Sequence, residues 1–395
     1  MKDSGSQISL LTAGRDRPYA LGLAPALAGA GVRLDFVGSD DLDSPELHES
    51  PQIRFLNLRG DQRANAGLVR RAVRVLAYYA RLIGYAVTAR PKIFHILWNN
   101  KFELFDRTAL MVWYRLLGKK IVFTAHNVNA RARDGGDSFL NRATLKFQYR
   151  RCGHIFVHTE KMKAELVAGY GVAADRVTVI PFGLNSTVPD TALAGADARR
   201  RLGLGERDKV LLFFGNIAPY KGVEYLVEAF LQAAGRHPDW RLVIAGRPKG
   251  GEDYWAGLQA QIAASPLRDQ FVLKIEFVPD EETEVYFKAA DVLILPYTHI
   301  FQSGVLFLGY NFGLPVLAAD VGSLKEEIIE GRTGGVFPAR DAAGLARALE
   351  TYFAGDLYGR LAERRPDIRA FARERYSWSK VARMTTAVYD QLMGK

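Results

Sequence analysis

The chain has 395 residues, of which 48% are hydrophobic and 24% charged, and its formal net charge is +10, a composition typical of a globular protein with room for two domains. A single cysteine, Cys152, excludes a disulfide framework and a cysteine-based metal site, and we expect it to be a small, partly buried residue in a reducing compartment. No apolar run reaches the ~18 residues that a membrane span needs and the N-terminal segment lacks a signal-peptide pattern, so a soluble or peripheral protein is predicted.

The positive charge is concentrated in one part of the chain. Between Arg54 and Arg151 there are 20 Lys or Arg against five acidic residues, a surplus of 15 that exceeds the +10 of the whole chain. A solvated basic face is one interpretation. The asymmetry also indicates an anionic partner, such as a membrane surface, a phospholipid or a nucleic acid. Since no nucleic-acid-binding module is recognisable, we favour an anionic membrane and no nucleic acid.

The first residues predict the opening of a Rossmann-like α/β domain. Residues 8–12 read as a strand, a loop that contains Asp16 follows, and a helix is expected through residues 21–27. A second strand is predicted at 32–37. The acidic residues 38–46 are expected to form a solvated loop rather than a metal site.

Residues 66–91 predict an amphipathic helix. Val69, Val73 and Leu76 lie at helical spacing and are expected to share its apolar face. The rim of that face is basic, with Arg70, Arg71, Arg74 and Arg81. Two interpretations stay open: the helix packs on a sheet, or it lies at the headgroup level of an anionic membrane.

Polar residues follow two predicted strands in the first half of the chain. Asn100 and Glu103 come after a strand at 94–98, and His126 and Asn127 come after a strand at 121–124. Loops at the carboxyl ends of parallel strands line ligand crevices in open α/β sheets. A lone histidine is more often structural, so pattern alone does not assign His126 a role.

The second half of the chain contains two loops suited to a phosphate. Lys221 lies in a glycine-punctuated loop after a strand at 210–214, where a lysine can reach a diphosphate as a point charge. After a strand at 292–295, Ser303, Gly304 and Val305 are expected at a helix N-terminus. Free N–H groups and the positive end of the helix dipole favour an anion there.

The order and content of these segments resemble the GT-B glycosyltransferases of family four. The residues that match the motifs of that family are Thr124, His126, Pro181, Gly183, Lys221, Gly222, Gly313, Pro315 and Val316. The resemblance implies an α/β GT-B fold of two Rossmann-like domains that face each other across a cleft. Residues 1–188 would be the acceptor domain and residues 189–375 the nucleotide-sugar donor domain, with residues 376–395 as a helix that crosses back to the first domain.

The resemblance also implies the site. In this family the matching histidine faces the donor sugar and the matching lysine faces the diphosphate, so catalytic roles are implied for His126 and Lys221. The implied donor-binding residues are Gly215, Asn216, Lys221, Arg247, Val278, Tyr297, His299, Gln302, Ser303, Gly304 and Val305. The residues expected on the acceptor side are Asp16, Asn100, Glu103 and Asn127. The family needs no metal and no cofactor beyond the nucleotide sugar.

The chain departs from the family at three positions. Ile300 and Leu308 stand where the family has two glutamates, and Asn216 stands where it has an arginine. Because Leu308 cannot accept a hydrogen bond, the ribose must be held otherwise, with Tyr297 or Gln302 as candidates. The lost carboxylate at Ile300 would let the site tolerate an anionic sugar such as a uronic acid.

The expected function is therefore transfer of a sugar, from a nucleotide diphosphate and in our interpretation from UDP, to a glycan acceptor. We expect a lipid-linked or oligosaccharide acceptor in bacterial polysaccharide or glycolipid assembly, on the cytoplasmic leaflet of the plasma membrane. Retention at the anomeric carbon is implied by the resemblance; an inverting enzyme would need a base, with Asp16, Glu103 and His126 as candidates. The alternatives are a nucleotide-binding pseudoenzyme and a nucleotide-sugar epimerase of the same fold.

Overall fold

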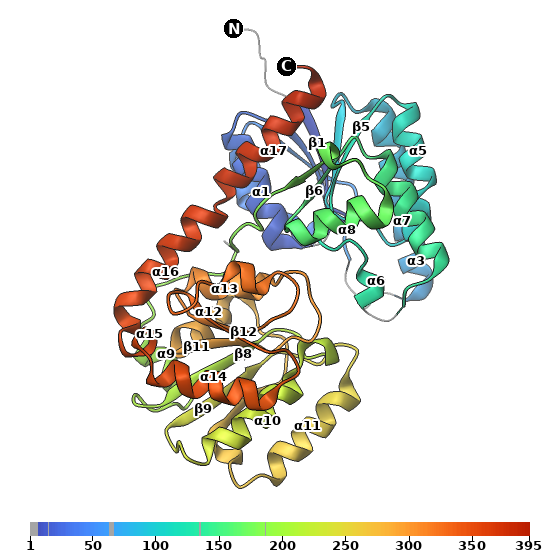
Figure 1. Cartoon of the computed structure of the whole chain (residues 1–395). Coiled ribbons are helices and arrows are strands. Elements are labelled where there is room, and N and C mark those ends of the chain that lie inside the picture. The colour runs from blue at the N-terminus through green and yellow to red at the C-terminus, as the bar shows by residue number, and fades with distance from the viewer. Residues whose placement is uncertain (1–6, 15, 63–66, 134–135, 186) are drawn as a thin grey trace. The chain divides into compact units, whose positions relative to one another are not determined.

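The computed structural model describes residues 7–14, 16–62, 67–133, 136–185 and 187–395, which form two compact units (Figure 1). The first unit comprises Met1–Gly183 and Tyr376–Lys395, and the second comprises Leu184–Arg375. The division at Gly183 lies a few residues before the boundary that the sequence predicts at residue 188. The return to the first unit at Tyr376 is where the sequence places it.

The described residues of the first unit contain a sheet of seven parallel strands. They are β1 (Gln7–Leu11), β2 (Arg33–Gly38), β3 (Ile53–Asn57), β4 (Ile93–Ile96), β5 (Lys120–Thr124), β6 (His154–Val157) and β7 (Val177–Val179). Their spatial order is β3-β2-β1-β4-β5-β6-β7. The chain moves outward from β1 to β3 and then continues at β4, on the other side of β1. The point where the strand order reverses therefore lies between β1 and β4, and ligands bind at the carboxyl ends of such strands.

Helices connect these strands and cover the sheet, as a buried parallel sheet requires. The helices of the first unit are α1 (Arg17–Gly29), α2 (Pro45–Glu49), α3 (Leu68–Thr88), α4 (Glu103–Arg107), α5 (Ala109–Leu116), α6 (Ala130–Arg133), α7 (Phe139–Arg151), α8 (Glu160–Tyr170) and α17 (Trp378–Met393), with short 3-10 helices η1 (Asp40–Leu42) and η2 (Ala174–Arg176). The loop predicted over residues 38–46 is thus partly helical.

The C-terminal helix α17 packs on α1 of the first unit, which confirms the predicted return of the chain (Figure 1). Tyr389 of α17 is fully buried, and its hydroxyl lies 2.5 Å from Nδ1 of His95 on the central strand β4. Val381 and Ala382 join the same hydrophobic core as Ile8 and Leu10 of β1. The last helix is therefore part of the first core.

The second unit repeats the architecture around a sheet of six parallel strands within its described residues. The strands are β8 (Lys209–Phe214), β9 (Trp240–Ala245), β10 (Phe271–Lys274), β11 (Val292–Leu295), β12 (Val316–Ala319) and β13 (Gly334–Phe337), in the order β10-β9-β8-β11-β12-β13. The helices are α9 (Gly195–Arg201), η3 (Pro219–Lys221), α10 (Val223–Ala234), α11 (Glu252–Ala264), η4 (Arg268–Gln270), α12 (Asp280–Ala289), α13 (Gly304–Asn311), η5 (Leu324–Glu327), α14 (Ala342–Ala354), α15 (Asp356–Gly359) and α16 (Leu361–Tyr376). Here the strand order reverses between β8 and β11. The two α/β domains predicted from the sequence are confirmed.

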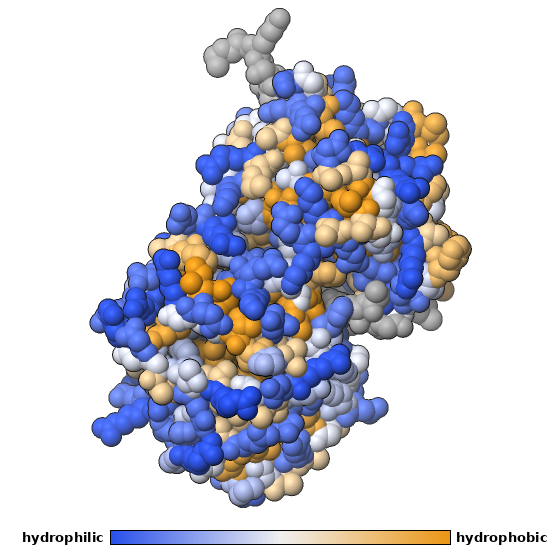
Figure 2. Space-filling model, in the orientation of Figure 1, coloured by the Kyte–Doolittle hydropathy of each residue, from blue (hydrophilic) through white to orange (hydrophobic). Residues whose placement is uncertain are grey.

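Helix α3 forms where it is predicted, and the predicted apolar face is exposed at three of its residues. Val69, Val73 and Leu76 are 78%, 58% and 62% exposed. The buried contacts come instead from the next turns, with Tyr78 and Tyr79. Residue 66, the expected start of the helix, lies outside the described residues. Apolar side chains gather on the flank of the first unit that carries α3, α5 and α7 (Figure 2).

None of the helices in the described part of the chain combines the length and apolar character needed to cross a bilayer. Cys152, at the end of α7, is 1% exposed, and burial raises the pKa of its thiol to about 12. A thiol with such a pKa stays protonated and unreactive at neutral pH.

Candidate functional site

In the second unit, the predicted phosphate-binding residues meet at the carboxyl ends of β8 and β11, where the strand order reverses. Lys221 follows β8, and Tyr297 and Ser303 follow β11. Nζ of Lys221 donates a hydrogen bond of 2.8 Å to the Tyr297 hydroxyl, which lies 3.1 Å from Oγ of Ser303. Three side chains from two loops are thereby held in one hydrogen-bonded chain.

The two loops pack against each other without space for a side chain between them. Gly222 has φ of +65°, and a Cβ there would lie 2.0 Å from the carbonyl oxygen of Pro296. Only glycine fits both the left-handed backbone and this contact. The close approach brings Lys221 to the loop that contains Tyr297.

Burial fixes the protonation state of Tyr297. Lys221 is only 7% exposed, and its Nζ lies 4.0 Å from the centroid of the Tyr297 ring. Burial raises the pKa of Tyr297 well above its usual range, so the phenol keeps its proton at neutral pH. Because an ammonium group can only donate, the Tyr297 oxygen accepts from Lys221 and its own proton is left to donate to Ser303. Tyr297 therefore positions Lys221 and Ser303 and is too buried, at 0% exposed, to hold a ribose.

Helix α13 begins at Gly304, as predicted, with Ser303 as its N-cap residue. The Ser303 side chain makes no capping hydrogen bond, since its oxygen faces Tyr297 instead. Gly304 is exposed and carries no side chain that would screen the first turn. The positive end of this eight-residue helix thus lies beside a buried ammonium group, and both favour an anion.

The two positions without glutamate differ in their surroundings. Leu308 is buried in the core at 5% exposed, and Ile300 is half-buried. The structure supplies another carboxylate from a different element: Oε1 of Glu327, in η5, accepts a hydrogen bond of 3.3 Å from Nε2 of Gln302. Its second oxygen lies 3.8 Å from Nε of Arg375. Sequence reasoning missed Glu327 because it lies far along the chain, after β12.

The remaining predicted donor residues surround this group more loosely. Asn216 and His299 are exposed, and Val278 is buried at 8% exposed. Arg247 is exposed and lies with its guanidinium carbon 5.4 Å from the centroid of the Phe277 ring. Two further predicted residues meet at the turn after β8, since a Cβ on Gly215 would lie 3.6 Å from Cγ2 of Val305. Their roles stay predictions.

In the first unit, His126 lies in an aromatic cage at the carboxyl end of β5. Its ring stacks on that of Trp98, with the centroids 4.1 Å apart and an interplanar angle of 1°. It forms a T-shaped contact with Tyr19, with the ring centroids 4.5 Å apart. Burial, and then the neighbouring His158, hold the pKa of His126 well below its usual range. The ring is therefore neutral at pH 7.

A second histidine determines which nitrogen of His126 carries the proton. Nδ1 of His158 lies 3.3 Å from the carbonyl oxygen of Ile180, and its Nε2 lies 3.1 Å from Nδ1 of His126. Burial lowers the pKa of His158 to about 4, so it too is neutral. A carbonyl can only accept, so His158 donates from Nδ1 and accepts at Nε2, and His126 must donate from Nδ1. Nε2 of His126 is then an unprotonated acceptor, and it is buried without a protein partner among the described residues.

His158 is a residue that sequence reasoning missed. It follows β6, as His126 follows β5, and the two strands are neighbours in the sheet. The signal was available, because equivalent positions after adjacent parallel strands lie side by side.

The four residues predicted on the acceptor side differ in their surroundings and contacts. Asp16 is the N-cap of α1 and accepts a hydrogen bond from the backbone N–H of Tyr19. Glu103 forms ion pairs with Arg107 at 2.9 Å and Arg131 at 3.1 Å, which makes it a poor candidate for a base. The other two are a buried Asn100 and a half-buried Asn127.

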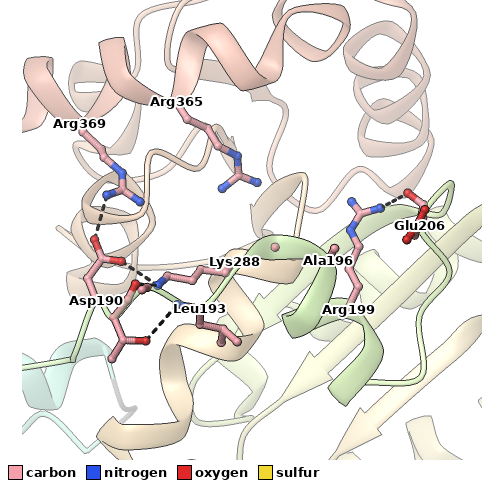
Figure 3. Close-up of a pocket in the computed structure, with 11 residues that line it drawn as sticks. Asp190, Leu193, Ala196, Arg199, Glu206, Lys288, Arg365 and Arg369 are labelled. Atoms are coloured by element: carbon pink, nitrogen blue, oxygen red, sulfur yellow. Dashed lines mark hydrogen bonds and ion pairs between the residues drawn. The ribbon is translucent and has the colours of Figure 1, made fainter.

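The second unit also contains an open cavity of about 750 Å³ near the amino ends of its strands, away from the carboxyl ends where Lys221 lies (Figure 3). Its charged residues satisfy one another. Arg199 forms two hydrogen bonds of 2.8 Å to Asp291, at the amino end of β11, and Lys288 pairs with Asp190 at 3.0 Å. Arg369 binds the same Asp190 at 2.8 Å. Because these pairs join neighbouring elements and the cavity lies away from the carboxyl ends of the strands, we interpret it as structural.

No group of three or more His, Cys, Asp or Glu in the described ranges is arranged to hold a metal ion. The chemistry that the described groups can perform is anion binding by Lys221 and α13, and Nε2 of His126 keeps a hydrogen-bond acceptor that no described residue uses.

Comparisons with known proteins match both units. Residues 18–188 match the family described as Glycosyltransferase Family 4, and residues 208–354 match the family described as Glycosyl transferases group 1. The D-inositol 3-phosphate glycosyltransferase of Acidothermus cellulolyticus is 34% identical over 205 residues, which are 49% of this chain and 45% of that protein. That of Corynebacterium efficiens is 25% identical over 389 residues, covering 94% of this chain and 89% of that protein. The chain thus spans about half the length of the former relative and most of the latter.

Two solved structures share the fold over nearly the whole chain. Sucrose-phosphate synthase from Thermosynechococcus elongatus has a TM-score of 0.75 at 20% identity, covering 98% of this chain and 99% of that one. Anabaena HepE in complex with UDP-glucose has a TM-score of 0.73 at 16% identity, covering 98% and 99%. With both units matched and both sheets present, the chain belongs to the GT-B glycosyltransferases of the group 1 and family 4 kind.

Proposed function

We propose that the protein transfers a sugar from a nucleoside diphosphate to an acceptor bound by the first unit. The observation that carries the proposal is the buried chain of Lys221, Tyr297 and Ser303 at the start of α13. A departing diphosphate needs cations and helix N–H groups, and this group supplies both without a metal. UDP as the nucleotide of the sugar donor is supported by the UDP and UDP-glucose complexes of Anabaena HepE.

His126 would then act on the sugar or on the acceptor hydroxyl. Its unprotonated Nε2 can accept a hydrogen bond from a hydroxyl group and orient it. With a pKa held low, this nitrogen is a weak base, which agrees with a retaining mechanism in which the leaving phosphate takes the acceptor proton. NMR of the anomeric configuration in the product tests this assignment, and an inverted product would contradict it.

The identity of the donor sugar depends on the charge of the residues around Gln302. The glutamate missing at Ile300 would let the site tolerate a uronic acid, but Glu327 places a carboxylate beside Gln302. Two like charges close together destabilise each other, so this carboxylate disfavours an anionic sugar near Gln302. Donor profiling with UDP-glucose, UDP-galactose and UDP-glucuronic acid distinguishes the cases.

Incubation of the protein with radiolabelled UDP-sugars and a membrane extract tests the proposal. Release of UDP together with a labelled acceptor supports a transferase. Nucleotide binding without turnover identifies a pseudoenzyme, and conversion of the free nucleotide sugar identifies an epimerase. Labelled lipid in the organic phase would support a lipid-linked acceptor in polysaccharide or glycolipid assembly, and a labelled soluble product would contradict it.

We also propose that the first unit associates with an anionic membrane, peripherally and on the cytoplasmic leaflet. Helix α3 exposes Val69, Val73 and Leu76 in successive turns, beside the exposed Arg70 and Arg81. Large apolar side chains are also exposed on neighbouring elements of the same unit: Phe102, Leu104, Phe139 and Leu140. Apolar groups rimmed by cations are the composition of a surface that inserts at the headgroup level of anionic lipids.

A further inference from the structure

A cavity of about 270 Å³ in the first unit lies at the carboxyl ends of its central strands. Three elements form it: the loop after β3, the first half of α3 and the loop after β4. Arg59 connects it to β1 as well, because its guanidinium group donates a hydrogen bond to the carbonyl oxygen of Ala13. The cavity is therefore at the point between β1 and β4 where the strand order reverses, which is where open α/β sheets bind ligands.

Four cations line this cavity against one carboxylate. Arg59, Arg71, Arg74 and Lys101 contribute the positive charges, and Asp61 contributes the negative charge. Cations gathered around one small cavity raise the electrostatic potential inside it, and a positive potential attracts an anion.

Two of the cations are held in place by the fold. The guanidinium carbon of Arg59 lies 5.2 Å from the centroid of the Tyr78 ring. Arg74 donates a hydrogen bond of 2.9 Å to the backbone carbonyl of Asp61 and lies 3.5 Å from its carboxylate. Guanidinium groups held in this way are preorganised, so less conformational entropy is lost when a ligand binds.

The floor of the cavity is a buried polar network. The Tyr78 hydroxyl donates a hydrogen bond of 2.6 Å to Oδ1 of Asn100, and Nδ2 of Asn100 donates one of 3.1 Å to Asp106. Asn100 is 8% exposed, so its amide is fixed where it lines the cavity. Cations on the walls and a fixed amide below them form a polar site of the size of a phosphate with part of a small organic group.

We infer that this cavity binds the phosphate group of a phosphorylated acceptor. The inference rests on the proposed function in naming the ligand as the acceptor, and it narrows the acceptor class to phosphate esters. Guanidinium groups bind phosphate oxygens through paired N–H donors, which accounts for three arginines in one small cavity. The phosphate would hold the acceptor at the carboxyl edge of the sheet, the edge where His126 also lies.

Titration calorimetry with inorganic phosphate tests the site in the Lys221→Ala background, which removes the proposed diphosphate site of the second unit. Arg71→Gln and Lys101→Gln change exposed side chains of the cavity, so we expect the fold to persist. Each should weaken phosphate binding about tenfold or more, as expected for the loss of one charged hydrogen bond. The matched control is Arg70→Gln, which removes the same charge from the adjacent position of α3, outside the cavity, and should bind phosphate as the parent does.

Two further arms separate a soluble phosphate ester from a phospholipid headgroup. If a headgroup occupies the cavity, Arg71→Gln weakens binding to vesicles that contain phosphatidic acid more than Arg70→Gln does. If a soluble ester does, Arg71→Gln weakens vesicle binding no more than Arg70→Gln, whose charge belongs to the proposed membrane surface, and Arg71→Gln alone weakens binding of inorganic phosphate. Equal phosphate affinity of the parent, both cavity variants and Arg70→Gln would overturn the inference. UDP binding to the wild-type protein is measured in parallel, so loss of the phosphate site and loss of the proposed donor site are distinguishable.

Discussion

Two side chains at the candidate site, Lys221 and His126, owe their chemistry to a hydrogen-bonded neighbour. Lys221 is buried against Tyr297, whose hydroxyl accepts from it at 2.8 Å. His126 is kept neutral by burial and is oriented by His158. In both cases the residue follows a strand at the carboxyl edge of its sheet, and the neighbour comes from the loop after another strand.

Lys221→Ala should weaken binding of UDP at least tenfold with the fold intact. The lost cation–phosphate contact is worth ~1.5–3 kcal/mol as a charged hydrogen bond. Calorimetry with UDP measures the affinity, and turnover at limiting donor should fall in parallel. Lys249→Ala is the control, because Lys249 is an exposed lysine in the loop after β9 of the same unit. Full activity of Lys221→Ala would show that the diphosphate binds elsewhere.

His158→Phe should lower the transfer rate about fivefold to a hundredfold while UDP affinity stays unchanged. The change removes the acceptor for Nδ1–H of His126, and an unsatisfied buried donor costs about 1–3 kcal/mol. His158→Gln, which offers a carbonyl acceptor, should restore part of the rate. Measuring kcat and the Kd for UDP on the same variants separates the two effects, since only kcat should change. Equal losses in transfer and UDP binding, or a large fall in Tm, would indicate a structural role only.

At the scale of elements, close packing decides how the C-terminal helix joins the first unit. A Cβ on Gly22 of α1 would lie 2.1 Å from the indole of Trp378, at the start of α17. The absence of a side chain at this position of α1 therefore admits the indole, and no shift of a flexible chain end could relieve the contact.

Gly22→Ala should destabilise the protein by about 1–3 kcal/mol, the usual effect of overpacking a core. Gly29→Ala is the matched control in the same helix, because a Cβ there meets no atom within 4 Å. The control should be neutral or stabilising by up to about 1 kcal/mol. Urea denaturation monitored by tryptophan fluorescence gives both values. Similar stability of the two variants would contradict the proposed contact.

Helix α3 offers the second test at this scale. Vesicles with anionic lipid should bind the protein at low salt, neutral vesicles should bind it weakly, and salt should release it, since each surface cation adds ~1 kcal/mol of attraction. Of the four arginines at the rim of α3, Arg74 pairs with Asp61 and Arg71 lines the cavity, so Arg70→Glu with Arg81→Glu is the pair that tests the membrane surface. Val73→Ser with Leu76→Ser should also weaken binding. Absence of binding to anionic vesicles at low salt would contradict the membrane proposal.

At the scale of the whole molecule, stability should depend on the histidines buried in the first unit. Burial lowers the pKa of His95 to about 3 and those of His154 and His158 to about 4, and it lowers that of His126 as well. Unfolded, each would have a pKa near 6.5. Between these values the unfolded chain binds more protons than the folded one, so stability is full above pH 6.5 and is lost as the pH falls. Asp16 and Asp106, whose pKa values burial raises to about 6, oppose this trend.

The free energy of unfolding should therefore fall between pH 6.5 and 5, by up to about 1.4 kcal/mol per pH unit for each buried histidine. Urea denaturation at pH 7.5, 6.5, 5.5 and 5.0 measures the slope. His154→Gln removes one titrating group and should make the slope shallower. A free energy that does not change over this window would contradict the neutral histidines on which the orientation of His126 depends.

The sequence determined the elements that local patterns encode. The strand at 292–295 has the predicted bounds, and Ser303 precedes the helix as expected. Apolar strands, amphipathic helices and glycine-rich turns depend on residues that are close in the sequence. They can therefore be predicted from the order of the amino acids. The family resemblance added the two domains and placed Lys221 and His126.

Only the tertiary structure decided which side chains face each other. The sequence left open whether the apolar face of α3 packs on a sheet, because periodicity shows that a helix is amphipathic and cannot show what covers it. In the structure Val73 is exposed, and Tyr78 and Tyr79 are buried instead. Glu327 beside Gln302, and the cations of the first-unit cavity, come from segments separated by other elements. Such contacts are set by strand order and by the packing of loops at one edge of a sheet. A linear pattern does not contain that information, because residues far apart in the chain become neighbours only when the sheet has formed.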